Sequence, residues 1–270
     1  MPTRPSRTVR TTAGALVAAA IALPAAGLPH PAAAATPPAP PHRPPAHATA
    51  AVLDLDGTGR TAVVRGADRA YDTASIVKVD ILAALLLRAQ DAGRPLSAAE
   101  RDLAEPMIRR SDNAATNALW RRIGRASGLA AANERLGLTS TTGGPGGKWG
   151  LTRTTASDQV RLLRAVFDSG GTVRRGSGGL DAGSRAYIRT LMSRVVSGQT
   201  WGVSAAGSPG SRPALKNGWL QRSTTGRWDV NSVGEVAVRG HRYLVAVLSD
   251  GNASMGDGVS LVERTARAAV

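Results

Sequence analysis

Two residues inside an apolar segment have the types and spacing for nucleophilic catalysis. Ser75 and Lys78 stand three residues apart in "TASIVKVDIL", residues 73–82. At the start of a helix, Ser75 would lie among free backbone N–H groups, and Lys78, one turn further on, would share its face. Burial lowers the pKa of a lysine, so Lys78 could take the proton of the Ser75 hydroxyl. The pair therefore indicates a serine nucleophile with lysine as its base.

The same pair also has a purely structural explanation. Ser75 could cap the helix, and Lys78 could lie along an apolar surface with its ammonium group in water. Two later stretches favour the catalytic interpretation, although each is unremarkable alone. "SDN" at 111–113 suits a helix N-cap, and "KNG" at 216–218 suits the end of a strand. Together, in this order and on these elements, the three stretches indicate one site.

The remaining residue types argue against several other kinds of site. Only one of the four histidines, His241, follows residue 48, and the chain has no cysteine, so we expect no metal site and no cofactor. A Ser-His-Asp triad would need His241, which we expect in a hairpin turn. "GTGRTA" at 57–62 is followed by a strand, which favours a turn over a dinucleotide-binding loop.

The chain is strongly basic, with a formal net charge of +15. Its arginines are scattered, without the basic runs and interleaved aromatic residues that would indicate nucleic-acid binding. We therefore expect no nucleic-acid partner. An arginine-rich solvated surface explains the charge, and anionic cell-wall polymers or lipid headgroups are the partners that it would suit.

The first 48 residues predict a leader and a tether. Arg4, Arg7 and Arg10 precede an apolar stretch of about a dozen residues, short of the roughly 20 that span a bilayer. Small residues follow, so we predict a secretory signal peptide over 1–35, with an uncleaved membrane anchor as the alternative. The proline-rich residues 36–48 predict a disordered tether. The protein would then be secreted or extracytoplasmic.

Residues 49–270 predict one α+β domain. We expect strands near both chain ends and helices between them, so that both ends share an antiparallel sheet flanked by helices, with an all-helical lobe beside it. The strands are expected over 48–56, 60–66, 214–220, 229–238 and 242–250, and the helices over 75–90, 96–110, 111–124, 126–138, 154–170, 181–196 and 258–270. A proline interrupts the second helix, and nothing indicates an oligomer, so we expect a monomer.

From residue 49 to its end, the sequence resembles the class A β-lactamases, which belong to the penicillin-recognising serine hydrolases. The resemblance rests on "TASIVKV", "SDNAATNAL", "WGLTRTTASD" and "KNGW", in this order. The interval from Ser75 to Ser111 is shorter than in the family, which implies a trimmed helical lobe.

The resemblance implies how acyl transfer would proceed. Ser75 would attack the substrate carbonyl and become acylated, with Lys78 as its base. Ser111 would pass a proton to the departing nitrogen. The backbone N–H groups of Ser75 and Trp219 would form the oxyanion hole.

The resemblance also implies how a substrate would be held. Asn113 would hydrogen-bond an amide of the substrate, and Lys216 would attract its carboxylate. Asn217 and Gly218 complete this motif. The family's usual Lys-Thr-Gly is Lys-Asn-Gly here, so an amide replaces a hydroxyl in the carboxylate-binding motif.

The sequence departs from the family where the acyl group would be released. Hydrolytic members carry Glu-x-x-Leu-Asn, whose glutamate activates water, whereas residues 139–150 contain no carboxylate. We expect Glu134 to be a solvated charge and Asp158 to belong to a capping box with Thr155. Lys148 would place a cation where the glutamate belongs. We therefore expect acylation with slow deacylation.

Three functions remain open from the sequence. The first is an exported serine hydrolase of β-lactamase type, acylated at Ser75 by β-lactams or related amides. The second is a D,D-peptidase-like enzyme that acts on peptidoglycan stem peptides. The third is a non-catalytic wall-binding relative, which would leave Ser75 unmodified.

Overall fold

The computed structural model describes residues 45–168 and 178–270. The signal peptide predicted over 1–35 lies outside the described residues, and so does the predicted tether up to residue 44. Within the described ranges, no helix combines the length and the apolar character needed to cross a lipid bilayer.

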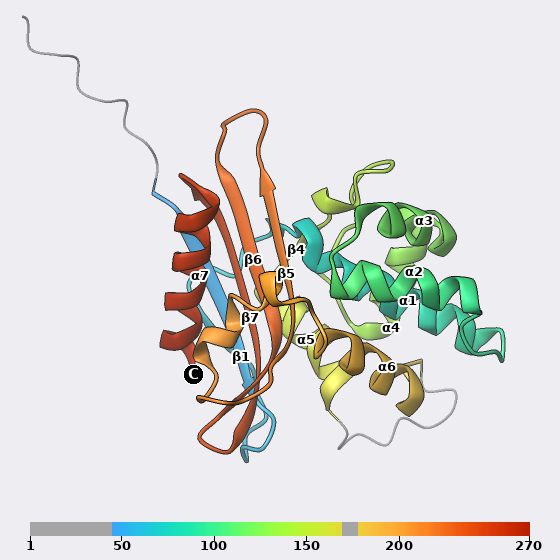
Figure 1. Cartoon of the computed structure of the whole chain (residues 1–270), viewed down its shortest axis with the longest axis horizontal. Helices are drawn as coiled ribbons and strands as arrows, with labels where there is room; N and C mark the ends of the chain where they lie inside the picture. Colours follow the sequence, from blue (N-terminus) through green and yellow to red (C-terminus); the bar gives the residue numbers. More distant parts are fainter. Residues whose placement is uncertain (1–44, 169–177) are drawn as a thin grey trace, which may run out of the picture. The chain divides into compact units, whose positions relative to one another are not determined.

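Five antiparallel strands from both ends of the chain form the main sheet, in the order β2-β1-β7-β6-β5 (Figure 1). This confirms the prediction of a shared sheet. β1 begins one residue before the predicted start of the strand at 48, because His47 pairs with Asp250 of β7. The strands are β1 (His47–Asp54), β2 (Val63–Arg65), β5 (Ala214–Gln221), β6 (Trp228–Val238) and β7 (His241–Asn252).

Helices cover both faces of this sheet. The central strand β7 carries a run of five buried apolar residues, 244–248, which is the pattern of a strand covered on both faces. α7 (Met255–Ala269) packs against one face and α5 (Ala156–Phe167) against the other. The edge strand β5 runs beside the helical lobe (Figure 1). The α+β class and the flanking helices agree with the prediction.

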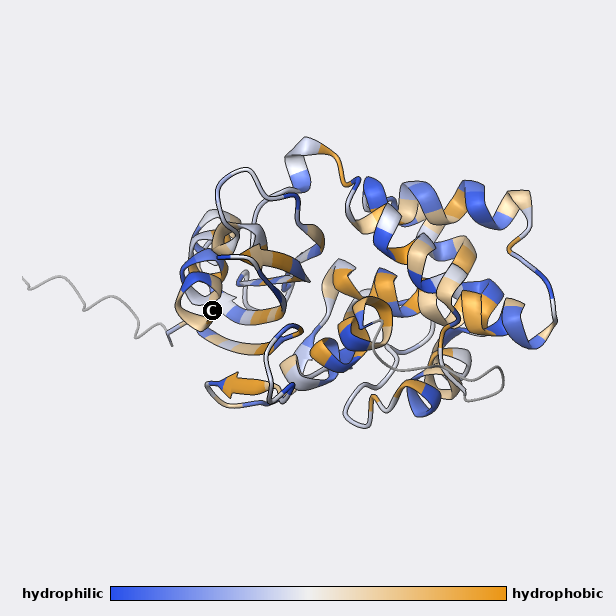
Figure 2. Cartoon of the chain, turned by 90° about the horizontal axis from the view of Figure 1, so that it is seen from below, coloured by the Kyte–Doolittle hydropathy of each residue, from blue (hydrophilic) through white to orange (hydrophobic). Residues whose placement is uncertain are grey.

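The helical lobe is built around α1 (Val77–Asp91). All residues from 77 to 87 are buried, and a helix that is apolar on every side belongs in a core. Its neighbours present their apolar sides to it, and their hydrophilic residues lie toward the outside (Figure 2). They are α2 (Ala98–Arg109), α3 (Asn113–Ile123), α4 (Arg125–Leu136) and α6 (Ala182–Met192).

Two local features differ from the prediction. Ser75 lies in a separate 3₁₀ turn, Ala74–Ile76, and α1 itself begins at Val77. The second helix continues through Pro106, which lies in its last turn. The carbonyl oxygen of Pro106 accepts from the N–H groups of Arg110 and Asp112.

A small second sheet connects the start of the lobe to the glycine-rich loop. It pairs β3 (Tyr71–Asp72) with β4 (Arg153–Thr154). Thr142, at the other end of the loop, forms a backbone bridge with Arg153. Residues 142–153 are therefore closed at their base beside the segment that leads to Ser75.

Candidate active site

The turn that carries Ser75 is held by the main sheet. The side chain of Asn231 on β6 donates to the carbonyl oxygens of Asp72 (2.9 Å) and Thr73 (3.1 Å). The next residue, Ala74, has a φ of 47°, a left-handed conformation that is costly for a residue with a Cβ. The chain is thus bent sharply just before Ser75, and β6 fixes the bend.

Lys78 lies at the centre of the candidate site. Its side chain is fully buried, and Nζ lies 2.8 Å from Ser75 Oγ and 2.8 Å from Asn113 Oδ1. Nζ also lies 2.7 Å from the carbonyl oxygen of Ser111 and 3.0 Å from its Oγ. Burial lowers the pKa of Lys78 to about 7, against a smaller opposing effect of the Asp112 carboxylate.

These four neighbours suit a neutral amine. The Ser111 carbonyl and Asn113 Oδ1 can only accept hydrogen bonds, whereas the hydroxyls of Ser75 and Ser111 can also donate. A neutral Lys78 has two N–H groups for the two pure acceptors and keeps one lone pair. That lone pair is then available to the Ser75 hydroxyl.

The SDN turn brings a second hydroxyl to the lysine. Asp112 caps α3, since its Oδ1 accepts from the N–H of Ala115 at 2.7 Å. Ser111, just before the cap, has a φ of 57°. The same turn leaves Asn113 exposed, so its amide N–H groups remain open to solvent.

The lysine of the KNG strand reaches the same hydroxyl from the other side. Lys216 Nζ lies 2.9 Å from Ser111 Oγ, 3.4 Å from Gln199 Oε1 and 2.7 Å from the carbonyl oxygen of Asn217. Lys216 is fully buried, and burial, together with the charge of Lys78, lowers its pKa well below the ordinary value. The two lysines therefore meet at the Ser111 hydroxyl.

Asn217 differs from the expectation that its amide would face a substrate. The side chain is fully buried, and its Nδ2 donates to the carbonyl oxygens of Gln199 (3.0 Å) and Trp201 (2.9 Å). Because side chains alternate along a strand, Asn217 lies on the face opposite to Lys216. Its amide therefore supports the segment that contains Gln199 and Trp201.

Gly218 lets strand β5 approach the Ser75 turn. A Cβ at this position would lie 2.6 Å from the backbone nitrogen of Ser75 and 2.8 Å from that of Ile76. Only glycine allows this contact. The indole of Trp219 packs against Trp201 with ring centroids 5.9 Å apart, which leaves its backbone as the part available to the site.

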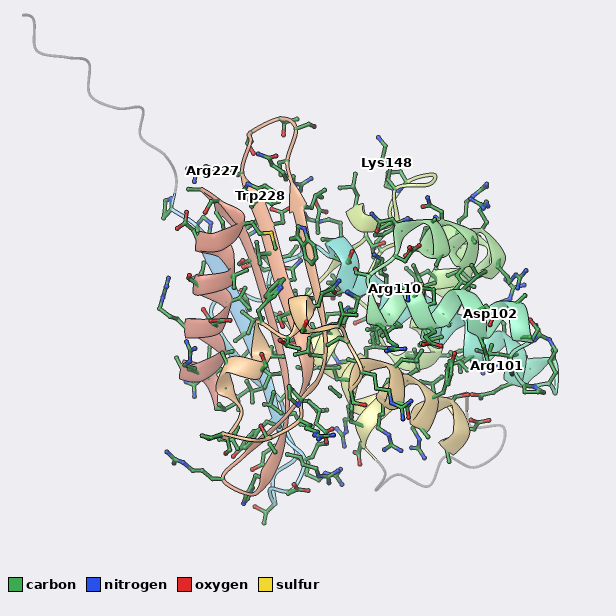
Figure 3. All side chains as sticks on the ribbon, in the orientation of Figure 1. Arg101, Asp102, Arg110, Lys148, Arg227 and Trp228 are labelled. Carbon is green, nitrogen blue, oxygen red and sulfur yellow. The ribbon has the colours of Figure 1, made fainter. Side chains whose placement is uncertain are left out.

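The glycine-rich loop places an aromatic ring over the lysine. The ring centroid of Trp149 lies 4.7 Å from Lys78 Nζ, and its Nε1 donates to Asn117 Oδ1 at 2.8 Å. From the sequence, we expected Lys148 to place a cation where the family has glutamate. Lys148 is exposed and extends away from the loop (Figure 3), because the next residue turns inward instead.

The two other carboxylates considered from the sequence lie elsewhere. Glu134 is exposed, as expected. Thr155 caps α5 by accepting from the N–H of Asp158 at 3.2 Å, but the Asp158 carboxylate is fully buried and has a further task. It accepts from the N–H of Ser140 (2.7 Å) and the hydroxyl of Thr141 (2.8 Å), and so holds the base of the loop.

The histidine and metal alternatives gain no support from the geometry. His241 begins β7, and its Nδ1 lies 3.0 Å from Asp54 Oδ2 rather than near Ser75. Within 45–168 and 178–270, no three His, Cys, Asp or Glu side chains gather in a way that could hold a metal ion.

Sequence reasoning missed three residues that shape the site: Gln199, Asn231 and Trp149. Gln199 contacts Lys216 and donates to the carbonyl of Arg110 at 3.0 Å, so it joins the KNG strand to the SDN turn. Gln199 and Asn231 belong to no motif. Trp149 carried a signal, because it is the one aromatic residue in a loop that lacks the expected glutamate.

Comparison with solved structures shows the same fold in known proteins. A penicillin G acyl-enzyme complex of a PBP-A variant is 25% identical and superposes with a TM-score of 0.66, over 83% of this chain and 89% of that chain. The TLA-3 extended-spectrum β-lactamase shares the fold at 14% identity, with a TM-score of 0.68 over 82% and 92% of the two chains.

A curated relative matches a shorter part of the chain. "Putative lipoprotein LppW" of Mycobacterium tuberculosis is 28% identical over 179 residues, which are 64% of this chain and 54% of that protein. The chain therefore spans about half the length of the curated relatives that it matches.

A family model described as "Beta-lactamase enzyme family" matches residues 95–270. The match includes the SDN turn and the KNG strand, and it begins after Ser75 and Lys78. It covers more than half of the 270-residue chain. The chain belongs to the beta-lactamase enzyme family.

Proposed function

We propose that this protein is an exported active-site serine hydrolase that β-lactams or related amides acylate at Ser75, and that releases the acyl group slowly. The observation that carries the proposal is the position of Lys78, which lies buried between the hydroxyls of Ser75 and Ser111. The penicillin G acyl-enzyme of the PBP-A variant supports the choice of substrate, because that protein shares the fold.

The geometry supports acylation as follows. Ser75 Oγ attacks the carbonyl carbon of the substrate while its proton passes to the neutral Lys78. The backbone N–H groups of Ser75 and Trp219 would stabilise the oxyanion, and the close approach of Gly218 to the backbone nitrogen of Ser75 supports this assignment. As the C–N bond breaks, the proton returns to the leaving nitrogen through the Ser111 hydroxyl, which lies 3.0 Å from Lys78 Nζ.

Substrate binding would use the exposed side of the SDN turn. The exposed amide of Asn113 can donate to an amide oxygen of the substrate. Lys216 is buried, which lowers its pKa, and its Nζ already has three partners within the protein. We therefore assign Lys216 mainly to orienting Ser111, with attraction of a carboxylate as a longer-range effect.

Slow release follows from the residue that faces Lys78. Hydrolysis of an acyl-enzyme needs a base beside the ester to activate water, and such help is worth about 10²–10⁴-fold in rate. Here the indole of Trp149 lies 4.7 Å from Lys78 Nζ, and the loop 139–150 offers no carboxylate. The indole cannot accept a proton from water, and its position beside Lys78 would leave less room for a water molecule there.

The setting of the reaction is also part of the proposal. A relative whose name describes it as a lipoprotein favours a location outside the cytoplasm for this protein. Such a location agrees with the signal peptide expected over 1–35. There the substrate would be a β-lactam or a peptidoglycan stem peptide, and the basic surface would suit anionic wall polymers. We also propose that the protein acts as a monomer.

Acylation should depend on pH through Lys78. Its pKa is lowered to about 7, so the neutral base is the minor form below pH 7 and the major form above it. We expect the second-order rate constant for acylation by penicillin G to rise about tenfold per pH unit below the pKa and to level off above pH 8. Stopped-flow or quenched mass measurements between pH 5 and 9 check this. A rate constant independent of pH over that range would contradict it.

Gly218→Ala should impair acylation more than folding. The added Cβ would meet the backbone nitrogens of Ser75 and Ile76 at 2.6 and 2.8 Å, so the turn must move away from β5. Misplacing one oxyanion donor costs about 10²–10³-fold in rate. The control is Gly59→Ala, where a Cβ has open space. Equal acylation rates in the two variants would show that the β5 approach has no role in the reaction.

Time-resolved intact-mass spectrometry tests the proposed function. Purified protein is mixed with penicillin G, and a Ser75→Ala variant is treated in parallel. We expect an adduct of the mass of penicillin on the wild type that persists for minutes or longer, and none on the variant. Turnover without an adduct would contradict slow release. The absence of both turnover and adduct would favour the non-catalytic wall-binding protein.

A D-Ala-D-Ala peptide as competitor distinguishes a peptidase from a β-lactamase. Faster turnover of the peptide than of penicillin would make the peptide the substrate.

A further inference from the structure

Asp80 is a buried carboxyl group that the proposed reaction does not use. It lies on α1, two residues after Lys78, and its side chain is 1% exposed. Among the described residues, no arginine, lysine or histidine forms an ion pair or a hydrogen bond with it. A charged carboxylate without a partner is expensive in such a place, and burial raises the pKa of Asp80 to about 7.

The neighbour of Asp80 is the amide of Gln159 on α5. Gln159 Nε2 donates to Asp80 Oδ1 at 3.4 Å, and the other oxygen of each group, Asp80 Oδ2 and Gln159 Oε1, is buried without a hydrogen-bond partner. Buried polar atoms without partners are rare, and two in one contacting pair call for an explanation. Both are acceptors, so one additional proton between them would satisfy both.

We propose that Asp80 is a neutral carboxylic acid that donates its proton to Gln159 Oε1, and that this acid–amide pair positions the loop that carries Trp149. The pair then has two hydrogen bonds, one in each direction. Loss of the proton leaves two oxygens facing each other in a buried place, so ionisation of Asp80 loosens the contact between α1 and α5.

The pair is one end of a polar chain that leads to the loop. Gln159 Nε2 also donates to Thr154 Oγ1 at 3.1 Å, and the hydroxyls of Thr154 and Thr141 lie 2.8 Å apart. Thr141 in turn donates to the buried carboxylate of Asp158 at 2.8 Å. Thr141 and Thr154 lie on the two sides of the loop base, so the chain ties that base to the helix that carries Lys78.

The charged groups around Asp80 favour its neutral form. Asp158 of α5 raises its pKa further, and Arg161 is engaged with Asp158. Lys78 on the same helix directs its Nζ to the SDN turn, and Arg153 of β4 forms its ion pair with Asp72. None of these cations is placed to stabilise a charge on Asp80.

Asp80→Asn is the decisive variant, because asparagine reproduces the neutral acid and cannot ionise. The pKa of Asp80 is raised in the folded state, so the wild type binds this proton more tightly when folded and loses stability as pH rises from about 4 to about 7. We expect the variant to match the wild type near pH 4.5 and to unfold at a temperature higher by about 4 °C or more at pH 8. Taking the difference between the two proteins cancels the titration of Lys78, which both contain.

The control is Asp102→Asn, an exposed position on α2 (Figure 3), which should leave the unfolding temperature unchanged at both pH values.

Hydrogen exchange of the 141–154 segment reports whether the Asp80–Gln159 pair positions the loop. After correction for intrinsic exchange rates, its protection should fall more between pH 5 and 8 in the wild type than in Asp80→Asn. A variant less stable than the wild type at pH 8, or equal loss of protection in both proteins, would overturn the proposal. Neither measurement uses a β-lactam, so failure here is distinct from failure of the proposed function.

Discussion

Replacing Lys78 by methionine is expected to slow acylation by penicillin G about 10²–10⁴-fold, because the reaction loses its general base. Methionine keeps most of the buried volume of lysine and removes the amine that touches Ser75 Oγ at 2.8 Å. The Ser111 carbonyl and Asn113 Oδ1 each lose a donor, which should cost about 1–3 kcal/mol where the atom stays dry. The rate of adduct formation by intact mass, with thermal unfolding alongside it, measures both effects.

The matched control for this variant is Lys148→Met. Lys148 is exposed and extends away from the body, so its charge should contribute little to the reaction. We expect Lys148→Met to be acylated at the wild-type rate. Equal slowing in both variants would mean that overall charge, rather than a positioned base, governs acylation.

Replacing Trp149 by glutamate is expected to convert slow release into turnover. The carboxylate would lie beside Lys78, and the loss of the indole would open space for water next to the acyl group. A general base at this position should speed deacylation by about 10²–10⁴-fold. The carboxylate should also raise the pKa of Lys78, so acylation should need a higher pH than in the wild type. The decay of the penicillin adduct and the hydrolysis of free penicillin measure the change.

Trp149→Gln distinguishes the effect of a general base from the effect of added room for water beside the acyl group. Glutamine has nearly the shape of glutamate and opens the same volume, but it cannot take a proton at neutral pH. We expect it to release the acyl group far more slowly than the glutamate variant. If the two variants release it equally fast, then water access alone limits deacylation and the missing carboxylate is not the cause.

Much of the fold could be predicted because its patterns are local. The buried run of β7 and the apolar α1 are direct consequences of composition, and the switch from helices to strands near Ala214 is visible in the periodicity. Two boundaries could not be predicted locally, because the bend at Ala74 and the start of β1 at His47 depend on contacts with strands far along the chain. A local pattern contains no information about such partners.

The site was predictable where motifs exist and not elsewhere. Ser75, Lys78, Ser111 and Lys216 do come together, because the spacing of motif residues reflects a shared geometry. The direction of the Asn217 amide could not be predicted, because it depends on the backbone near Gln199. The buried Asp158 and the ring of Trp149 likewise owe their roles to long-range packing.

Locating the acylated residue tests the central claim most directly. The protein is treated with penicillin G, digested with a protease at acidic pH to preserve the ester, and analysed by tandem mass spectrometry. We predict that the penicillin-derived group is found on the peptide containing Ser75, with fragment ions that assign it to that side chain. A group attached to any other residue, or an unmodified Ser75 in a protein that hydrolyses penicillin, would contradict the account.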